Sequence, residues 1–190
     1  YKRQWSISDS ENDNIPWKFP EISLNSDEYL VIWASDKDRS QISYVRTLID
    51  EGDIFKYIIP NSSTSALWRF LSFNDSNWDN GNSGFGYDDN DDNTIISPGT
   101  ISVYLRKKIQ ISDISKISKL ILDIDYDDGF VAYINGVEVA RANISGSPPS
   151  YDSTTLIDHE AQIYSGGFPD RFSIENPGEI LNNGENSLAI

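Results

Sequence analysis

The sequence feature that most constrains the fold of this chain is the alternation of apolar and polar residues along residues 101–111. Successive side chains of a strand point to opposite faces of its sheet, so a period of two separates a buried set from a solvated set. The inward set would be Ile101, Val103, Leu105, Ile109 and Ile111, with Lys107 among them, and the outward set Ser102, Tyr104, Arg106, Lys108 and Gln110. The pattern predicts a strand with one buried and one wet face.

The same period continues along residues 120–126, where Asp123 and Asp125 would point outward. Two runs of β-prone residues, 130–134 and 137–140, then surround Asn135-Gly136, which predicts a hairpin because a type I′ turn needs positive φ at both central residues. Helical patterns are scarce, and residues 112–118 suit one helical turn at most. With further strands expected at residues 29–33, 54–59, 172–174 and 188–190, the sequence predicts an all-β sandwich.

The charge balance limits the classes of partner that the chain can bind. The chain has 190 residues, with 30 Asp and Glu against 15 Lys and Arg, and a formal net charge of −15. Such a surface repels phosphate backbones and anionic membranes, so we expect no nucleic acid and no membrane insertion, whereas neutral sugars and divalent cations are not disfavoured. There is no cysteine, which excludes disulfides and thiolate metal sites. The chain also lacks methionine, and we expect it to be a segment of a larger secreted or cell-surface protein.

An acidic loop at residues 87–93 is the first candidate site. Calcium prefers six to eight hard oxygen ligands, and this loop offers four carboxylates, although it lacks the glycine and glutamate spacing of an EF-hand. A solvated acidic turn explains the same composition. If a metal binds, we expect structural calcium, held by Asp88, Asp89, Asp91 and Asp92.

Asp127 and Asp128, where the strand of residues 120–126 ends, form the second candidate site. Carboxylates at a loop edge accept hydrogen bonds from sugar hydroxyls, but an Asp-Gly turn that caps backbone amides accounts equally for Asp128. Exposed aromatic rings would complete a sugar site by stacking on the apolar face of the sugar. The predicted ligand-binding residues are Asp127, Asp128, Tyr87, Tyr151 and Trp68.

Nothing in the sequence predicts catalysis. His159 is the only histidine, no motif for a serine nucleophile accompanies it, and we expect it to be a hydrogen-bonded loop or surface group. The acidic residues lie in hydrated contexts, without the raised pKa that a glycosidase acid requires. We therefore predict that the chain is not an enzyme.

Two segments resemble known families. Residues 17–20 and 29–38 resemble the closing part of a lamin-tail domain, an immunoglobulin-like sandwich of secreted bacterial proteins. Residues 46–190 resemble a galactose-binding-like jelly roll that follows lamin-tail domains in surface proteins of Bacteroidetes-type bacteria, some of which also carry a spore-coat-protein-H-like kinase domain. This second resemblance depends on Trp68, on residues 73–78 and 81–87, on residues 103–107, on the stretch DIDYDDGFVAYINGVEVAR at residues 123–141 and on Gly184, Glu185 and Asn186.

The resemblance implies a partial immunoglobulin-like strand segment at residues 1–45 and a jelly-roll sandwich at residues 46–190. It also implies that Asp127 and Asp128 match positions that help to bind sugar in related modules, in some of them through calcium. The predicted function is a non-catalytic carbohydrate-binding or accessory module. The alternative is an architectural spacer that positions a neighbouring domain of the same polypeptide and binds no small molecule.

Overall fold

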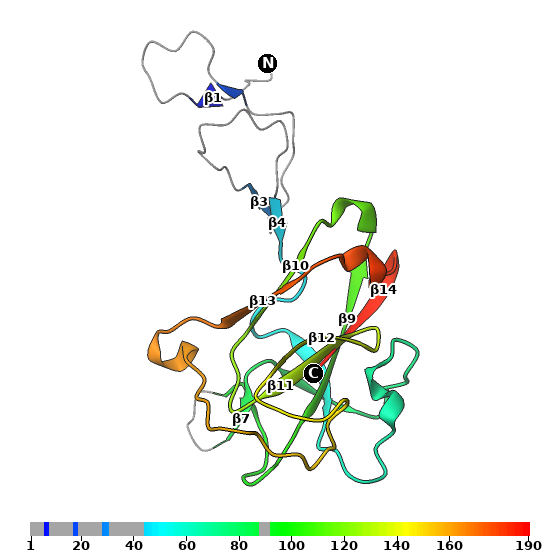
Figure 1. Cartoon of the computed structure of the whole chain (residues 1–190), viewed down its shortest axis with the longest axis vertical. Coiled ribbons are helices and arrows are strands. Elements are labelled where there is room, and N and C mark those ends of the chain that lie inside the picture. Colours follow the sequence, from blue (N-terminus) through cyan, green and yellow to red (C-terminus); the bar gives the residue numbers. More distant parts are fainter. Residues whose placement is uncertain (1–5, 8–16, 19–27, 31–43, 88–91) are drawn as a thin grey trace. The chain divides into compact units, whose positions relative to one another are not determined.

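The computed structural model describes residues 6–7, 17–18, 28–30, 44–87 and 92–190, and the chain divides into two compact units, Tyr1–Leu48 and Ile49–Ile190 (Figure 1). In the first unit two short antiparallel pairs are described. Strand β1 (Ser6–Ile7) pairs with β2 (Trp17–Lys18), and β3 (Glu28–Leu30) pairs with β4 (Tyr44–Arg46). The last three residues of the predicted strand 29–33 lie outside the described residues, and the lamin-tail assignment stays a prediction.

The second unit is built on a six-stranded antiparallel sheet with the order β12-β11-β14-β9-β5-β6. Its strands are β5 (Ile54–Ile58), β6 (Asp79–Asn82), β9 (Tyr104–Ile111), β11 (Phe130–Ile134), β12 (Val137–Ala142) and β14 (Gly184–Ala189). Two smaller pairs accompany it: β10 (Leu120–Ile124) with β13 (Asp170–Ile174), antiparallel, and β7 (Phe85–Gly86) with β8 (Thr94–Ile95), parallel.

Helical structure in the described residues consists of four 3₁₀ turns, η1 (Ala66–Arg69), η2 (Ile114–Lys116), η3 (Ile163–Ser165) and η4 (Pro177–Glu179). Within these described ranges, no helix has the length and apolar character needed to cross a bilayer.

The Asn-Gly hairpin is present as predicted. Asn135 and Gly136 have φ values of 53° and 90°, and Ile134 pairs with Val137 across the turn. The Asn135 side chain also joins the turn to β14, because its Oδ1 accepts a hydrogen bond from the backbone N–H of Ser187 at 2.9 Å. The Phe70 ring lies directly on the turn: a Cβ at Gly136 would come within 2.6 Å of Cε1 of Phe70. Gly136 is therefore required both by its φ value and by the packing of this ring.

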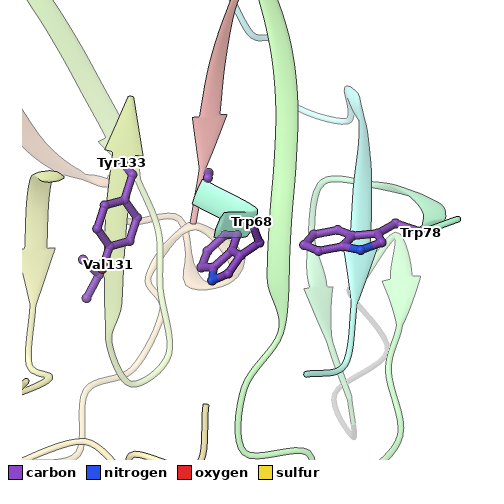
Figure 2. Packing of buried hydrophobic residues seen from close by; sticks show 5 residues of the cluster. Trp68, Trp78, Val131 and Tyr133 are labelled. Carbon is purple, nitrogen blue, oxygen red and sulfur yellow. The ribbon is translucent and has the colours of Figure 1, made fainter. Parts of the chain in front are cut away.

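Strand β11 is the centre of the core, since all five of its residues are buried. On one face Phe130 meets Phe172 of β13 edge to face, with ring centroids 5.1 Å apart. On the other face Val131 and Tyr133 lie beside Trp68 of η1 (Figure 2). Layers therefore cover both faces of the strand, and the predicted all-β sandwich is confirmed.

Two positions of the strand predicted at residues 101–111, Ile101 and Arg106, differ from the prediction. Strand β9 begins at Tyr104, and Ile101, which was assigned to the core, is 62% exposed. Arg106, which was assigned to the wet face, is 1% exposed. The reason is that η1 and the loop after it cover this half of the strand, with Trp68 stacked on Tyr104 at a centroid distance of 4.0 Å. The outward positions of Lys108 and Gln110 are confirmed.

Arg106 connects this covering segment to the sheet. Its Nε donates a hydrogen bond to Oδ2 of Asp75 at 2.8 Å, and its Nη1 donates to the carbonyl oxygens of Trp68 and Phe70. The guanidinium also lies over the Phe73 ring, 5.4 Å from its centroid. The buried Arg106 guanidinium thus binds this segment at residues 68, 70 and 75 and holds it against β9.

We expect Asp75→Ala to lower the free energy of unfolding by about 3 kcal/mol, because it leaves the Arg106 guanidinium buried without its counter-ion. Urea denaturation monitored by tryptophan fluorescence measures this change. Asp79→Ala, which removes an exposed carboxylate from β6, is the control and should change stability by no more than about 0.5 kcal/mol. Equal stability of the Asp75 variant and the wild type would show that the ion pair does not stabilise the fold.

Candidate functional site

The turn between β10 and β11 and the loop that covers it, residues 143–169, form the candidate site. Asp125 holds the far part of this loop: its carboxylate accepts hydrogen bonds from the backbone N–H groups of Gln162 and Ile163, each at 2.8 Å. These amides open the 3₁₀ turn η3 and have no carbonyl partner within it. Asp125 therefore caps η3 and fixes its position.

Asp128 and Asn143 hold the middle of the loop. The carboxylate of Asp128 accepts a hydrogen bond from the backbone N–H of His159 at 2.7 Å. The Asn143 side chain donates to the carbonyl oxygen of Asp128 at 3.0 Å and accepts from the N–H of Ile157 at 3.1 Å. The Asp128 carboxylate thus binds a backbone amide of the protein itself. This is the amide-capping role that the sequence offered as the alternative to sugar binding.

His159 anchors the same loop through its ring, as the sequence led us to expect. The ring stacks on Tyr126 at a centroid distance of 4.1 Å with 9° between the planes. Its Nδ1 lies 2.9 Å from the carbonyl oxygen of Tyr126, which can only accept, so Nδ1 carries the proton. The Tyr126 hydroxyl donates to Oδ2 of Asp170 at 3.1 Å, and Nε2 of His159 lies 3.8 Å from the same oxygen.

Asp127, by contrast, is exposed at the rim of this site. Partial burial of its carboxyl, followed by the nearby charges of Asp128 and Glu160, raises the pKa of Asp127 above the ordinary value. The expectation that no acidic residue here has a raised pKa is therefore wrong for Asp127. Glu160 is also exposed. The exposed carboxylates of the rim thus include Asp127 and Glu160, with Asp158 also exposed in the loop.

The anchored loop also presents large apolar side chains to solvent. Phe168 is 85% exposed and Tyr164 is 64% exposed; the other exposed members are Leu156, Ile157 and Ile163. Single exposed apolar residues are ordinary, whereas a contiguous apolar patch is a feature of interaction sites. Internal hydrogen bonds to Asp125, Asp128 and Asn143 hold the loop backbone at residues 157–163. The exposed side chains therefore extend from a loop whose central backbone is fixed.

The other predicted ligand residues do not join this site. Trp68 is 6% exposed and lies in the core on the opposite face of β11, so the prediction that its ring forms a sugar platform is wrong. Tyr151 is half-buried in the loop before residue 156, where its carbonyl accepts a hydrogen bond from the Ser102 hydroxyl at 2.5 Å. Tyr87 is half-buried at the end of β7.

Most of the predicted calcium loop lies outside the described residues, which include Asp92 but not Asp88, Asp89 or Asp91. The Asp92 carboxylate packs against β7, because a Cβ at Gly86 would lie 2.5 Å from both of its oxygens. Among the described residues there is no group of three or more side chains suited to hold a metal ion. Calcium at this loop stays a prediction.

Sequence reasoning missed two parts of the site. Asp125 was placed on the outer face of its strand, which did not indicate that it caps η3. Phe168 was not considered, although an aromatic residue between Gly166-Gly167 and Pro169 cannot belong to a regular strand and is therefore a candidate for display.

No protein-family model matches the chain, and no curated protein matches its sequence. Two solved structures are similar to it. A beta-glycosidase from Bacteroides vulgatus aligns with a TM-score of 0.40 and 15% identity over 75% of this chain and 16% of its own. A beta-glucuronidase from an uncultured Clostridium sp. aligns with a TM-score of 0.44 and 17% identity over 85% of this chain and 23% of its own. The chain spans less than a quarter of either protein, and similarity this low carries no conclusion about function.

Two aspartates of this region should affect stability with opposite signs. The raised pKa of Asp127 means that its ionised form destabilises the folded state above that pKa, so Asp127→Asn should melt higher than the wild type at pH 7. The hydrogen bond from Arg171 to Asp123 lowers the pKa of Asp123, so Asp123→Asn should melt lower. The Asp127 difference should vanish below about pH 3, where this carboxyl is protonated in both the folded and the unfolded state. The Asp123 difference should persist to lower pH, until the pH falls below the lowered pKa of the folded state.

Thermal melts of the two variants and the wild type between pH 3 and pH 7 measure these effects. A destabilised Asp127→Asn variant at pH 7 would contradict the electrostatic account of the rim.

Proposed function

We propose that this chain is a non-catalytic carbohydrate-binding module of a secreted or cell-surface protein. The observation that carries the proposal is the pair of exposed rings, Tyr164 and Phe168, on a loop whose rim also bears the Asp127 and Glu160 carboxylates. Aromatic rings stack on the apolar face of a sugar, and carboxylates accept hydrogen bonds from its hydroxyls. The site therefore combines the two kinds of contact that a neutral sugar requires.

The anchoring of the loop supports the same proposal. A binding loop that must be ordered on contact loses affinity, whereas one held in advance avoids that cost. Asp125 and Asp128 hold the backbone of residues 159–163, and the His159 ring fills the space beneath it against Tyr126. The exposed side chains can then bind without first ordering the backbone.

The absence of catalysis is part of the proposal. The carboxylates of Asp125, Asp128 and Asp170 accept hydrogen bonds from internal donors, and those roles compete with service as a general acid or nucleophile. Incubation of the chain with chromogenic glycosides tests this point, and release of the chromophore above the level of a heat-denatured sample would refute it.

The alternative function is a spacer that positions a neighbouring domain of the same polypeptide. Leu156 and Ile157, which are 67% and 69% exposed, favour this alternative because aliphatic side chains suit a protein contact more than a sugar contact. Retention of the chain by a glycan separates the two functions.

Affinity electrophoresis in gels that contain neutral plant and host polysaccharides, together with a glycan array, should detect binding by the wild type. We expect Phe168→Ala and Tyr164→Ala each to weaken it about tenfold, because a stacked ring contributes roughly 1 kcal/mol beyond the area that it buries. Ile95→Ala, which removes another exposed apolar side chain, should bind as the wild type does. If no polysaccharide retains the wild type, with or without calcium, the spacer function is favoured.

Calcium is tested by thermal melts with the ion or with a chelator present. A ligand that binds the folded state alone stabilises it by about 2.7 kcal/mol at one hundred times its Kd, so a structural site should raise Tm in millimolar calcium and lose the increase in chelator. Replacement of Asp88, Asp89 and Asp91 by Asn should abolish the increase. Identical melts under the two conditions would remove calcium from the proposal.

A further inference from the structure

Arg69, on the face of β11 that packs against Trp68, is held in an unusual position for a basic side chain. It is the last residue of η1, and Arg106 fixes the backbone on both sides of it by donating to the carbonyls of Trp68 and Phe70. The Arg69 guanidinium lies over the Tyr133 ring, 4.9 Å from its centroid, and 5.9 Å from the centroid of Phe70. A cation is thus placed between two aromatic rings.

Arg69 differs from the other arginines of the second unit in its charge partners. Arg106 pairs with Asp75, Arg141 with Glu138 and Arg171 with Asp123, whereas Arg69 has no ion pair in the described part of the chain. Its Nε and Nη2 make only long hydrogen bonds, both of 3.4 Å, to the carbonyl oxygen of Ala66. In a chain with a net charge of −15, a guanidinium without a carboxylate partner is the exception.

The Tyr133 hydroxyl next to Arg69 also lacks a partner. Tyr133 is 3% exposed, and no described group meets hydrogen-bond geometry with its hydroxyl. Buried polar atoms are nearly always satisfied, so an orphaned hydroxyl calls for a water molecule or a ligand. Burial raises the pKa of Tyr133, an effect that the charge of Arg69 and the hydrogen-bonding approach of its guanidinium to the hydroxyl oppose only in part. The guanidinium can only donate to the hydroxyl oxygen, so the hydroxyl keeps its proton and can donate it to an acceptor.

The charged groups around this pair leave Arg69 as the available cation. Glu138 is bound to Arg141 through both oxygens, at 2.6 Å and 2.7 Å, and Arg141 also donates to the carbonyl of Ile144. Asp152, which acts on the neighbouring Tyr104, is exposed to solvent. At physiological ionic strength charges are screened beyond about 8 Å, so the more distant carboxylates act weakly here.

We propose that Arg69, the Tyr133 hydroxyl and the Phe70 ring form a second binding site, for the carboxylate of an acidic sugar such as a uronic acid. This inference rests on the proposed function for the choice of a sugar, but it uses different residues, on the face of β11 that packs against Trp68. A guanidinium binds a carboxylate through two parallel hydrogen bonds. Phe70, which is 40% exposed, offers a ring to the apolar face of the sugar.

The geometry gives each group a separate task. A carboxylate that pairs with Arg69 draws the guanidinium away from its long contacts with Ala66 and brings an oxygen within reach of the Tyr133 hydroxyl. A single anion then provides the carboxylate that Arg69 lacks and an acceptor for the proton of the Tyr133 hydroxyl. A neutral sugar offers no such partner, so the site should discriminate by charge.

Calorimetric titration of the full chain with trigalacturonate and with its methyl ester tests the site, because esterification removes the charge and keeps the sugar rings. We expect the wild type to bind the acid at least about tenfold more tightly than the ester, as for the loss of hydrogen bonds to a charged group. Arg69→Gln should lose this preference. Arg171→Gln, which removes an exposed arginine elsewhere with the same change in net charge, should keep it.

Tyr133→Phe provides the second variant. Removing an unsatisfied buried hydroxyl should leave Tm unchanged or slightly higher, while affinity for trigalacturonate falls severalfold. A hexaglutamate peptide is the competing source of carboxylates, and we expect it to bind more weakly than the sugar acid because it offers no ring for Phe70.

The outcomes separate this inference from the proposed function. Failure of the wild type to bind trigalacturonate, equal binding of acid and ester, or equal losses in Arg69→Gln and Arg171→Gln would overturn the acidic-sugar site while leaving neutral-glycan binding through Phe168 untouched. Binding of hexaglutamate as tightly as trigalacturonate would overturn the choice of a sugar. Loss of trigalacturonate binding in Phe168→Ala would instead place the acid at the anchored loop and also refute the second site.

Discussion

The packing of the second unit depends on one buried cation. Arg106 lies in the middle of β9 at 1% exposure, and a charge in that position is tolerated only because Asp75 and two backbone carbonyls surround it. Since those partners all come from residues 68–75, the same contacts hold this segment over the sheet. Trp68 is thereby placed beside Tyr133 (Figure 2) and against Tyr104. The adjacent Arg69 is held over the Tyr133 ring.

The acidic composition of the chain has a structural use on the opposite face. Asp125 and Asp128 accept hydrogen bonds from backbone amides of a loop with little regular structure of its own. These carboxylates take the place of the carbonyl acceptors that the amides would have in a sheet. Asp127 and Glu160 are among the carboxylates that remain exposed in this region. Asp125, Asp128 and Asp170 are thus structural.

The sandwich could be predicted from the sequence because period-two burial and the Asn135-Gly136 turn are local signals. The position of Arg106 could not, because alternation assigns a face but does not reveal that a distant segment, residues 66–75, covers the face that was expected to be wet. Trp68 was assigned to a binding surface for a related reason: a tryptophan in a loop suits a platform or a core, and the contact with Tyr104 that decides between them is non-local. The anchoring role of His159 could be predicted because a lone histidine has few chemical alternatives.

The contact between Phe70 and Gly136 has a consequence for how this sequence can vary. The turn requires a left-handed backbone at residue 136, and the ring occupies the volume that any side chain there would need. Two independent constraints, one conformational and one steric, therefore both require glycine at residue 136. Among related chains that keep the aromatic ring, residue 136 should be invariant, and a chain that has lost the ring could admit asparagine or aspartate in its place.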